Sequence, residues 1–131
     1  MKKVIVLSVM LLLSVVSFSQ QKESAIHDVS SEEFKKVMDS MGDEVVVDLR
    51  TPEETSKGKI PGAIEMDFYG SGFKPSIAAL DRNKVYLVYC AGGKRSGETA
   101  ALMQEMGFRN IYNLEDGYNG WVKDKMPVVK K

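Results

Sequence analysis

Two short apolar runs, Val45 to Leu49 and Val85 to Tyr89, place the strongest constraint on how this chain folds. Both are rich in β-branched or aromatic residues, and Asp48 is the one charged residue in the first run. Runs that are apolar on both faces are typical of the inner strands of a parallel sheet. With helical segments between them, they predict an α/β domain built on a small, mostly parallel sheet.

Segments with helical periodicity alternate with these strands. The first begins near Ser30, which has Glu33 at the capping-box spacing, and ends near Gly42. Its apolar side chains recur at helical intervals: Phe34, Val37, Met38 and Met41. Further elements are predicted as a helix start at Thr51 to Glu54, a short strand at Ala63 to Met66, a loop at Tyr69 to Pro75, a helical turn at Ile77 to Leu80, a helix from Ser96 to Met106, a strand at Ile111 to Leu114, and a last helical turn at Tyr118 to Lys123 with Trp121 in the core.

The first 19 residues have the pattern of a secretory signal peptide. Lys2 and Lys3 precede an apolar run over residues 4–16, and the small residues Ser17 and Ser19 follow it. The alternative is an uncleaved membrane anchor, but the run is shorter than the roughly 20 residues that span a bilayer. We therefore expect a signal peptide at 1–19, a single domain at 20–131, and an exported protein, periplasmic or secreted, with no membrane attachment after cleavage.

Charge and cysteine content narrow the function. The chain has 18 basic and 18 acidic residues, so loss of Lys2 and Lys3 leaves a small acidic excess. A general nucleic-acid binder needs a basic excess, so we expect no nucleic-acid partner. Cys90 is the one cysteine and has no partner for an intramolecular disulfide. It is therefore buried and inert, paired with another molecule, or reactive.

The residues after Cys90 favour a reactive thiolate. A predicted strand ends at Cys90, and a predicted helix follows the sequence Ala91, Gly92, Gly93, Lys94, Arg95 and Ser96. Ligands of parallel sheets bind beyond the carboxyl ends of the strands. Two glycines allow a tight turn whose N–H groups point inward and form a nest for negative charge, next to the positive end of a helix. These features, with two cations, are expected to lower the pKa of Cys90.

No base or metal assists Cys90 in this interpretation. His27 is the one histidine, and it lies before the first predicted helix, where it is expected to be an ordinary surface or loop residue. One cysteine and one histidine also do not supply the clustered ligands of a zinc site. We expect no metal and no cofactor, and we expect the loop itself to activate the thiol.

The chain resembles the rhodanese-like sulfurtransferases from about Ser30 to Trp121. The motifs that carry the resemblance are Val47 to Arg50 with Glu53 and Glu54, Gly58 to Ala63, the Cys90 to Ser96 loop, Gly107-Phe108, Asn113-Leu114, and Gly117-Tyr118 leading to Trp121. The resemblance implies a rhodanese-like α/β fold, with the small, mostly parallel sheet flanked by helices on both faces.

The resemblance also implies a function for the loop. Cys90 would carry sulfur as a persulfide, in a cradle formed by Ala91 to Ser96, and Arg95 with Lys94 would bind a small anionic donor such as thiosulfate. A thiol or cyanide would accept the sulfur. Asp48 and Arg50 would support the loop from the neighbouring strand end. Alternatively, Asp48 is a hydrogen-bonded buried carboxylate and Arg50 a structural ion-pair partner.

Departures from the family pattern leave alternatives open. The family usually has His in place of Lys59 and often Gly in place of Asp116, and Ala91 stands where many thiosulfate-using members have Arg. Similar phosphatases and arsenate reductases have five residues between Cys and Arg, whereas four separate Cys90 from Arg95. A shorter ring of amides favours a sulfur atom over a tetrahedral oxyanion. A sulfur carrier or binding module without turnover is the second hypothesis, and phosphatase or arsenate-reductase activity is the third. The sequence does not specify an oligomeric state.

Overall fold

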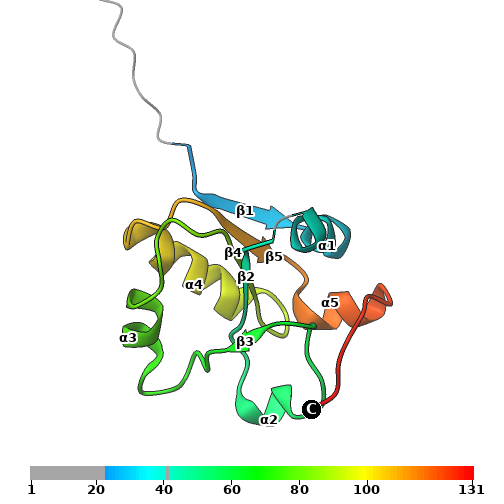
Figure 1. Cartoon of the computed structure of the whole chain (residues 1–131). Coiled ribbons are helices and arrows are strands. Elements are labelled where there is room, and N and C mark those ends of the chain that lie inside the picture. Colours follow the sequence, from blue (N-terminus) through cyan, green and yellow to red (C-terminus); the bar gives the residue numbers. More distant parts are fainter. Residues whose placement is uncertain (1–22, 41) are drawn as a thin grey trace, which may run out of the picture.

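A computed structural model describes residues 23–40 and 42–131, and within them five strands form one sheet (Figure 1). The order is β1–β5–β4–β2–β3, and every neighbouring pair is parallel. The strands are β1 (Ile26–Val29), β2 (Val45–Asp48), β3 (Ile64–Glu65), β4 (Tyr86–Tyr89) and β5 (Ile111–Leu114). The predicted α/β class with a parallel sheet is confirmed. The predicted signal peptide and Met41 lie outside the described residues.

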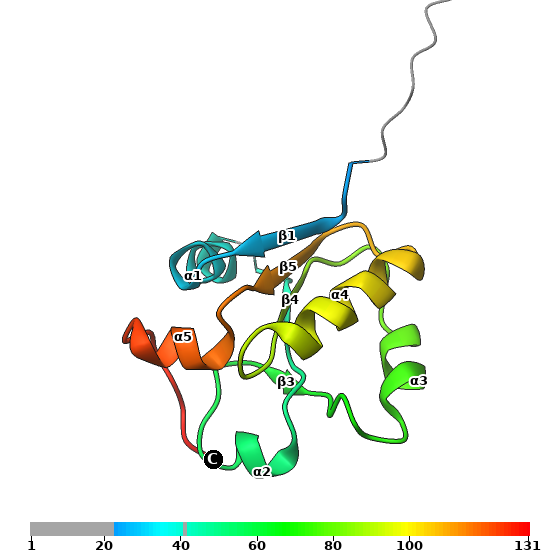
Figure 2. The same ribbon diagram turned by 180° about the vertical axis from the view of Figure 1, so that it is seen from behind.

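Helices cover both faces of the sheet, as Figures 1 and 2 show from opposite sides. One face carries α3 (Phe73–Ala78) and α4 (Lys94–Glu105), and the other carries α1 (Ser31–Ser40) and α5 (Gly117–Lys123). The short helix α2 (Pro52–Thr55) follows β2. Each face has its own apolar core. Val47, Val88, Met103 and Phe108 are buried on the α3/α4 face, and Val46, Leu87, Phe34 and Trp121 on the α1/α5 face.

The two inner strands explain why the sequence folds in this way. All four residues of β4 are buried, and β2 is buried from Val46 to Asp48. Alternate side chains of each strand point to opposite faces, so a strand that is apolar at every position can contribute to both cores. Burial of these side chains under helices on two faces supplies the main stabilising term of the fold.

Three local predictions differ from the structure. Strand β1 was not predicted, because His27 and Asp28 interrupt a short edge segment whose two middle residues are exposed. Helix α3 begins at Phe73, inside the predicted loop. Pro75 is compatible with this start because it lies in the first helical turn, where its missing N–H costs no hydrogen bond. Helix α4 begins at Lys94, two residues earlier than predicted.

Among residues 23–40 and 42–131, no helix has the length and apolar character needed to cross a membrane.

Candidate active site

Cys90 lies directly after β4, at the carboxyl end of the sheet, and is 1% exposed. Its Sγ accepts a hydrogen bond from the N–H of Gly93 at 3.1 Å and a longer one from the N–H of Ser96 at 3.4 Å. The Ser96 hydroxyl lies 3.4 Å from the same sulfur and 3.2 Å from the carbonyl of Gly93. The loop therefore folds around the sulfur atom and surrounds it with donors.

These donors decide the ionisation of Cys90. Burial by itself would raise the pKa of the thiol, because it removes the charged form from water. Hydrogen bonds from the Ser96 hydroxyl and from the N–H groups of Ser96, Gly93 and Gly92 stabilise the thiolate, and they bring the pKa of Cys90 below its ordinary value. A thiolate is the nucleophilic form of cysteine. The geometry can activate Cys90 without a histidine.

The turn between β5 and α5, together with the first residues of α5, packs directly against this loop. The N–H of Tyr118 donates to the carbonyl of Cys90 at 2.7 Å, and the N–H of Asn119 donates to the carbonyl of Ala91 at 3.0 Å. A Cβ at Gly93 would lie 2.1 Å from the carbonyl oxygen of Glu115, and one at Gly117 would lie 2.4 Å from that of Ala91. Both glycines also have positive φ angles, of 100° and 62°. The two segments fit together because neither position carries a side chain.

Arg95, in the first turn of α4, forms an ion pair with Glu54 of α2 that we call the rim pair. Its two terminal nitrogens donate to the two carboxylate oxygens of Glu54 at 2.7 and 2.9 Å. The side chain of Arg95 is 16% exposed and that of Glu54 is 32% exposed. The hydrogen bond from Arg95 outweighs partial burial and, with further bonds from Thr51, lowers the pKa of Glu54 to about 2.

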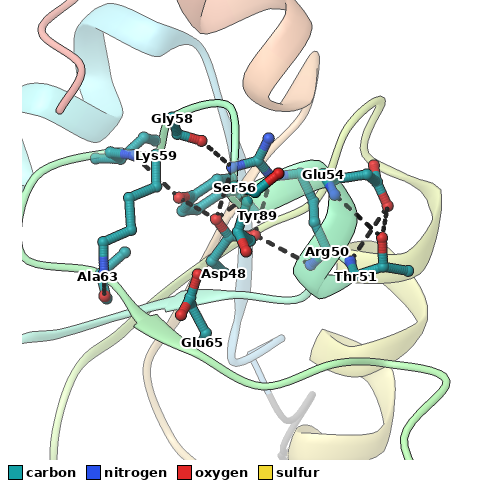
Figure 3. Close-up of polar contacts among 12 residues, drawn as sticks. Asp48, Arg50, Thr51, Glu54, Ser56, Gly58, Lys59, Ala63, Glu65 and Tyr89 are labelled. Carbon is teal, nitrogen blue, oxygen red and sulfur yellow. Dashed lines mark hydrogen bonds and ion pairs between the residues drawn. The ribbon is translucent and has the colours of Figure 1, made fainter. Parts of the chain in front are cut away.

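Helix α2 holds Glu54 in position independently of Arg95. The Thr51 hydroxyl accepts a hydrogen bond from the N–H of Glu54, and the Glu54 carboxylate accepts from the N–H of Thr51 at 3.2 Å. These reciprocal bonds form a capping box, which Figure 3 shows, and Pro52 occupies the first helical turn. The carboxylate is thus fixed at the N-terminus of a short helix.

Asp48 and Arg50 form a second ion pair, which we call the buried pair. Their side chains are 0% and 4% exposed, and the Arg50 guanidinium donates to both oxygens of Asp48 (Figure 3). Tyr89 donates its hydroxyl to Asp48 at 2.6 Å, and Arg50 also donates to the carbonyl of Gly58 at 2.8 Å. Burial and the Asp48 carboxylate raise the pKa of Tyr89 well above its usual range, so its hydroxyl stays protonated.

The buried pair lies on the opposite face of the sheet from the Cys90 side chain. Asp48 is in register with Tyr89, whose ring is in the α1/α5 core, whereas Cys90 belongs to the α3/α4 core. Its connection to the loop is indirect. The Arg50 guanidinium carbon lies 3.9 Å from the ring centroid of Tyr118, the residue whose N–H donates to the carbonyl of Cys90.

The remaining predicted loop residues differ in exposure. Gly92 and Lys94 are exposed, Ala91 and Gly93 are partly buried, and Ser96 is buried. Lys94 therefore presents a solvent-exposed charge at the start of α4, while the charge of Arg95 is matched by Glu54. Lys59, which replaces a usual family histidine, donates to the carbonyl of Ala63 at 2.9 Å (Figure 3).

Sequence reasoning did not assign Glu54, Tyr89 and Tyr118 to the site. The sequence indicates Glu54 only as part of a helix start and of a family motif. The available signal was the spacing of Thr51 and Glu54, which matches a capping box and predicts a fixed carboxylate. Its partner is 41 residues away in the chain, so the pair itself is visible only in the folded structure.

Comparison with known proteins assigns the chain to a family. The model of the rhodanese-like domain matches residues 30–124, and the chain belongs to this family. A sulfurtransferase of Allochromatium vinosum is 29% identical over 104 residues, which cover 79% of this chain and 95% of that protein. The thiosulfate sulfurtransferase PspE of Escherichia coli is 32% identical over 85 residues, which cover 64% of this chain and 77% of that protein.

Solved structures agree with this assignment. A rhodanese-related protein from Thermoplasma volcanium superposes with a TM-score of 0.70 and 25% identity, and the match covers 80% of this chain and 99% of that chain. The fold and the relatives together support a protein of the rhodanese-type sulfurtransferase and sulfur-carrier class.

Proposed function

We propose that this protein transfers sulfane sulfur by carrying it as a persulfide on Cys90. The observation that carries the proposal is the arrangement of donors around Sγ, where N–H groups of the loop and the Ser96 hydroxyl surround a buried sulfur. Such an arrangement stabilises a thiolate before reaction. It would stabilise the negative charge of a persulfide after reaction for the same reason.

The reaction has two steps. In the first, the Cys90 thiolate attacks the outer sulfur of a donor; a bond forms between Sγ and this sulfur, the donor's own bond to it breaks, and the leaving group departs with the electron pair. From thiosulfate the leaving group is sulfite. In the second, an acceptor thiolate or cyanide attacks the outer sulfur of the persulfide, and Cys90 is released as a thiolate. Charge and atoms balance in both steps, and no redox partner or cofactor is required.

Loop length supports sulfur as the cargo. Four residues separate Cys90 from Arg95, and the loop N–H groups are directed at the cysteine sulfur itself. A phosphatase or arsenate reductase would also need a guanidinium free to bind a tetrahedral oxyanion, but the terminal nitrogens of Arg95 are bonded to Glu54. Both features disfavour oxyanion chemistry at this site.

Mass spectrometry after donor treatment tests the proposal. The protein is incubated with thiosulfate, or with an organic persulfide, and the intact mass is compared with that of Cys90→Ser. We expect a gain of one sulfur atom on Cys90, and we expect Cys90→Ser to lose turnover by more than about a thousandfold because the nucleophile is absent. An unmodified protein whose turnover survives Cys90→Ser would refute the proposal.

Turnover kinetics separate the transferase from a carrier. A transferase shows ping-pong kinetics with repeated turnover when donor and acceptor are both present. Loading of Cys90 by every donor without repeated turnover on thiols or cyanide would instead identify a sulfur carrier. Hydrolysis of an aryl phosphate or reduction of arsenate at comparable rates would favour the oxyanion alternative.

We also propose that the protein is exported. The support is the sequence of residues 1–19, with two lysines, an apolar run and small residues near the expected cleavage position. Expression in the source cell followed by fractionation and N-terminal sequencing tests this. We expect an exported protein that begins after Ser19, and a cytoplasmic protein that begins at Met1 would refute it.

A further inference from the structure

The rim pair adjoins the Cys90 loop, because Arg95 directly precedes Ser96, whose N–H and hydroxyl each lie 3.4 Å from Sγ. Arg95 belongs to the same loop as Cys90, and the negative charge of the thiolate contributes, after Glu54, to raising the pKa of Arg95. When the outer sulfur of a donor meets Sγ, we expect its leaving group to lie near the rim pair, since Arg95 is next to Ser96 in the chain. We therefore expect the charges of Arg95 and Glu54 to affect binding of the leaving group more than binding of the transferred sulfur.

Glu54 occupies the part of Arg95 that an oxyanion would need. The two terminal nitrogens of a guanidinium form a planar fork that binds two oxygens of a carboxylate, sulfonate or phosphate. In this structure both nitrogens donate to Glu54, at 2.7 and 2.9 Å. The carboxylate is already held by the Thr51 cap, so little side-chain freedom remains to be lost when the pair forms. Thiosulfate would have to displace a fixed anion.

Aromatic side chains lie next to the rim pair. Tyr69 is 71% exposed, and its ring centroid lies 5.7 Å from the guanidinium carbon of Arg95. Phe68 packs edge-on against Tyr69 at 5.2 Å between ring centroids. Because the pKa of Glu54 is about 2, its carboxylate is negatively charged at neutral pH. Exposed Lys94 is then the one loop cation without an ion pair in the described part of the chain.

We propose that Glu54 is a specificity-determining residue, which disfavours donors with an oxyanion leaving group, such as thiosulfate, and favours organic persulfides. This inference rests on the proposed sulfur transfer and names the donor class for it. With a persulfide R–S–SH, the Cys90 thiolate attacks the outer sulfur, the bond between the two donor sulfurs breaks, and the thiolate R–S⁻ leaves with the electron pair. The proton stays on the transferred sulfur, and no oxyanion needs Arg95.

The test compares two donors in the intact protein and in Glu54→Gln. The donors are thiosulfate and 2-hydroxyethyl persulfide, which has no carboxylate or sulfonate. Glutamine keeps the shape of the side chain and an oxygen for the Thr51 cap, but it removes the charge. We expect Glu54→Gln to raise kcat/KM for thiosulfate about tenfold, chiefly through a lower KM, because a partly exposed cation is freed for the dianion. For the persulfide we expect a change of less than about twofold.

Ionic strength gives a readout that a structural role would not move. Freed of its partner, Arg95 should attract thiosulfate over a longer range, so kcat/KM of Glu54→Gln should fall more steeply with added salt than that of the unaltered protein. Glu53→Gln is the matched control, since Glu53 is exposed on the same helix and makes no ion pair among the described residues. It removes the same charge and should leave both donors and the salt dependence unchanged.

The outcomes separate failure of this inference from failure of the proposed function. If Glu54→Gln lowers kcat/KM equally for both donors, Glu54 only positions Arg95 and the specificity role is wrong. An unchanged ratio of kcat/KM between the two donors also overturns the specificity role. The proposed sulfur transfer through Cys90 would not be affected by that result. If neither donor loads sulfur on Cys90 of the unaltered protein, the function itself fails. Should Glu54→Gln not fold, as thermal melting would show, Glu54→Asp retracts the carboxylate and should shift the ratio in the same direction.

Discussion

The buried pair and the rim pair contain the same chemical groups in different surroundings. Asp48 and Arg50 are 0% and 4% exposed and have further partners in Tyr89 and Gly58. Glu54 and Arg95 are 32% and 16% exposed, and Arg95 directly precedes Ser96, whose N–H donates to the Cys90 sulfur. Removal of one partner leaves an uncompensated charge in the first case, whereas in the second case water can solvate it. From this difference in depth we expect the buried pair to act mainly on stability, whereas the rim pair is the one that we propose to affect donor binding.

The largest expected effect comes from breaking the buried pair. Asp48→Asn removes the charge that compensates Arg50, and we expect the free energy of unfolding to fall by about 3–5 kcal/mol. Urea unfolding followed by circular dichroism measures the change. A loss below about 1 kcal/mol would show that water reaches Arg50, and the contrast between the two pairs would then collapse.

A double variant sharpens this result. Asp48→Leu combined with Arg50→Met removes both charges, and apolar replacement of a buried ion pair is often close to neutral. We expect the double variant to recover much of the lost stability but not all of it. The Tyr89 hydroxyl and the Gly58 carbonyl would lose their partners, and unsatisfied buried groups are costly.

A smaller effect is expected when the hydroxyl half of the Thr51–Glu54 capping box is removed. Thr51→Ala deletes the hydroxyl that bonds to Glu54, and loss of such an N-cap costs about 1 kcal/mol. Because Glu54 becomes less fixed, the preference between thiosulfate and persulfide should move in the direction of Glu54→Gln, but less far. Denaturation and the two-donor assay measure both effects. Loss of stability with no change in donor preference would show that the Thr51 hydroxyl is not needed to position Glu54, and that Arg95 and the N–H of residue 51 suffice.

The smallest expected effect is the acid sensitivity of the rim pair. The pKa of Glu54 is about 2 in the folded chain, below its ordinary value of 4.5. Its contribution to stability is therefore present above pH 4.5 and is lost as the pH falls toward 2. Solvent screening limits this contribution to less than about 1 kcal/mol. The unfolding midpoint is measured at pH 6 and at pH 2.5, and its drop between the two should be smaller in Glu54→Gln than in the unaltered protein. An equal drop would contradict a stabilising ion pair between Glu54 and Arg95.

The two central strands, and the position of Cys90 at the end of one of them, could be predicted from the sequence. Val45 to Leu49 and Val85 to Tyr89 are apolar at nearly every position, and such runs fit few places other than the middle of a covered parallel sheet. Strand β1 escaped prediction because its identity depends on pairing with β5, and its own residues alternate poorly. Edge strands with polar residues have weak local signals.

Side-chain partners across the site could be predicted only in part. In the structure Asp48 is paired with Tyr89, and strand alternation then places Asp48 and Cys90 on opposite faces. The sequence does not give this register, because register is a tertiary property. The sequence motif placed Asp48 and Arg50 near the loop, and the structure shows them connected to it through Tyr118. The pairing of Arg95 with Glu54 depends on how α2 and α4 approach each other, and no local pattern encodes it.

The close fit of Gly93 and Gly117 restricts how this site can diverge over evolutionary time. A side chain at either position would collide with a carbonyl oxygen of the facing segment, so single substitutions there are expected to be lost by selection. Insertion of a residue into the loop would face the same barrier unless the β5–α5 turn changed in the same lineage. We therefore expect the two segments to evolve together. A change of the site toward a larger bound group would need coordinated substitutions in both segments.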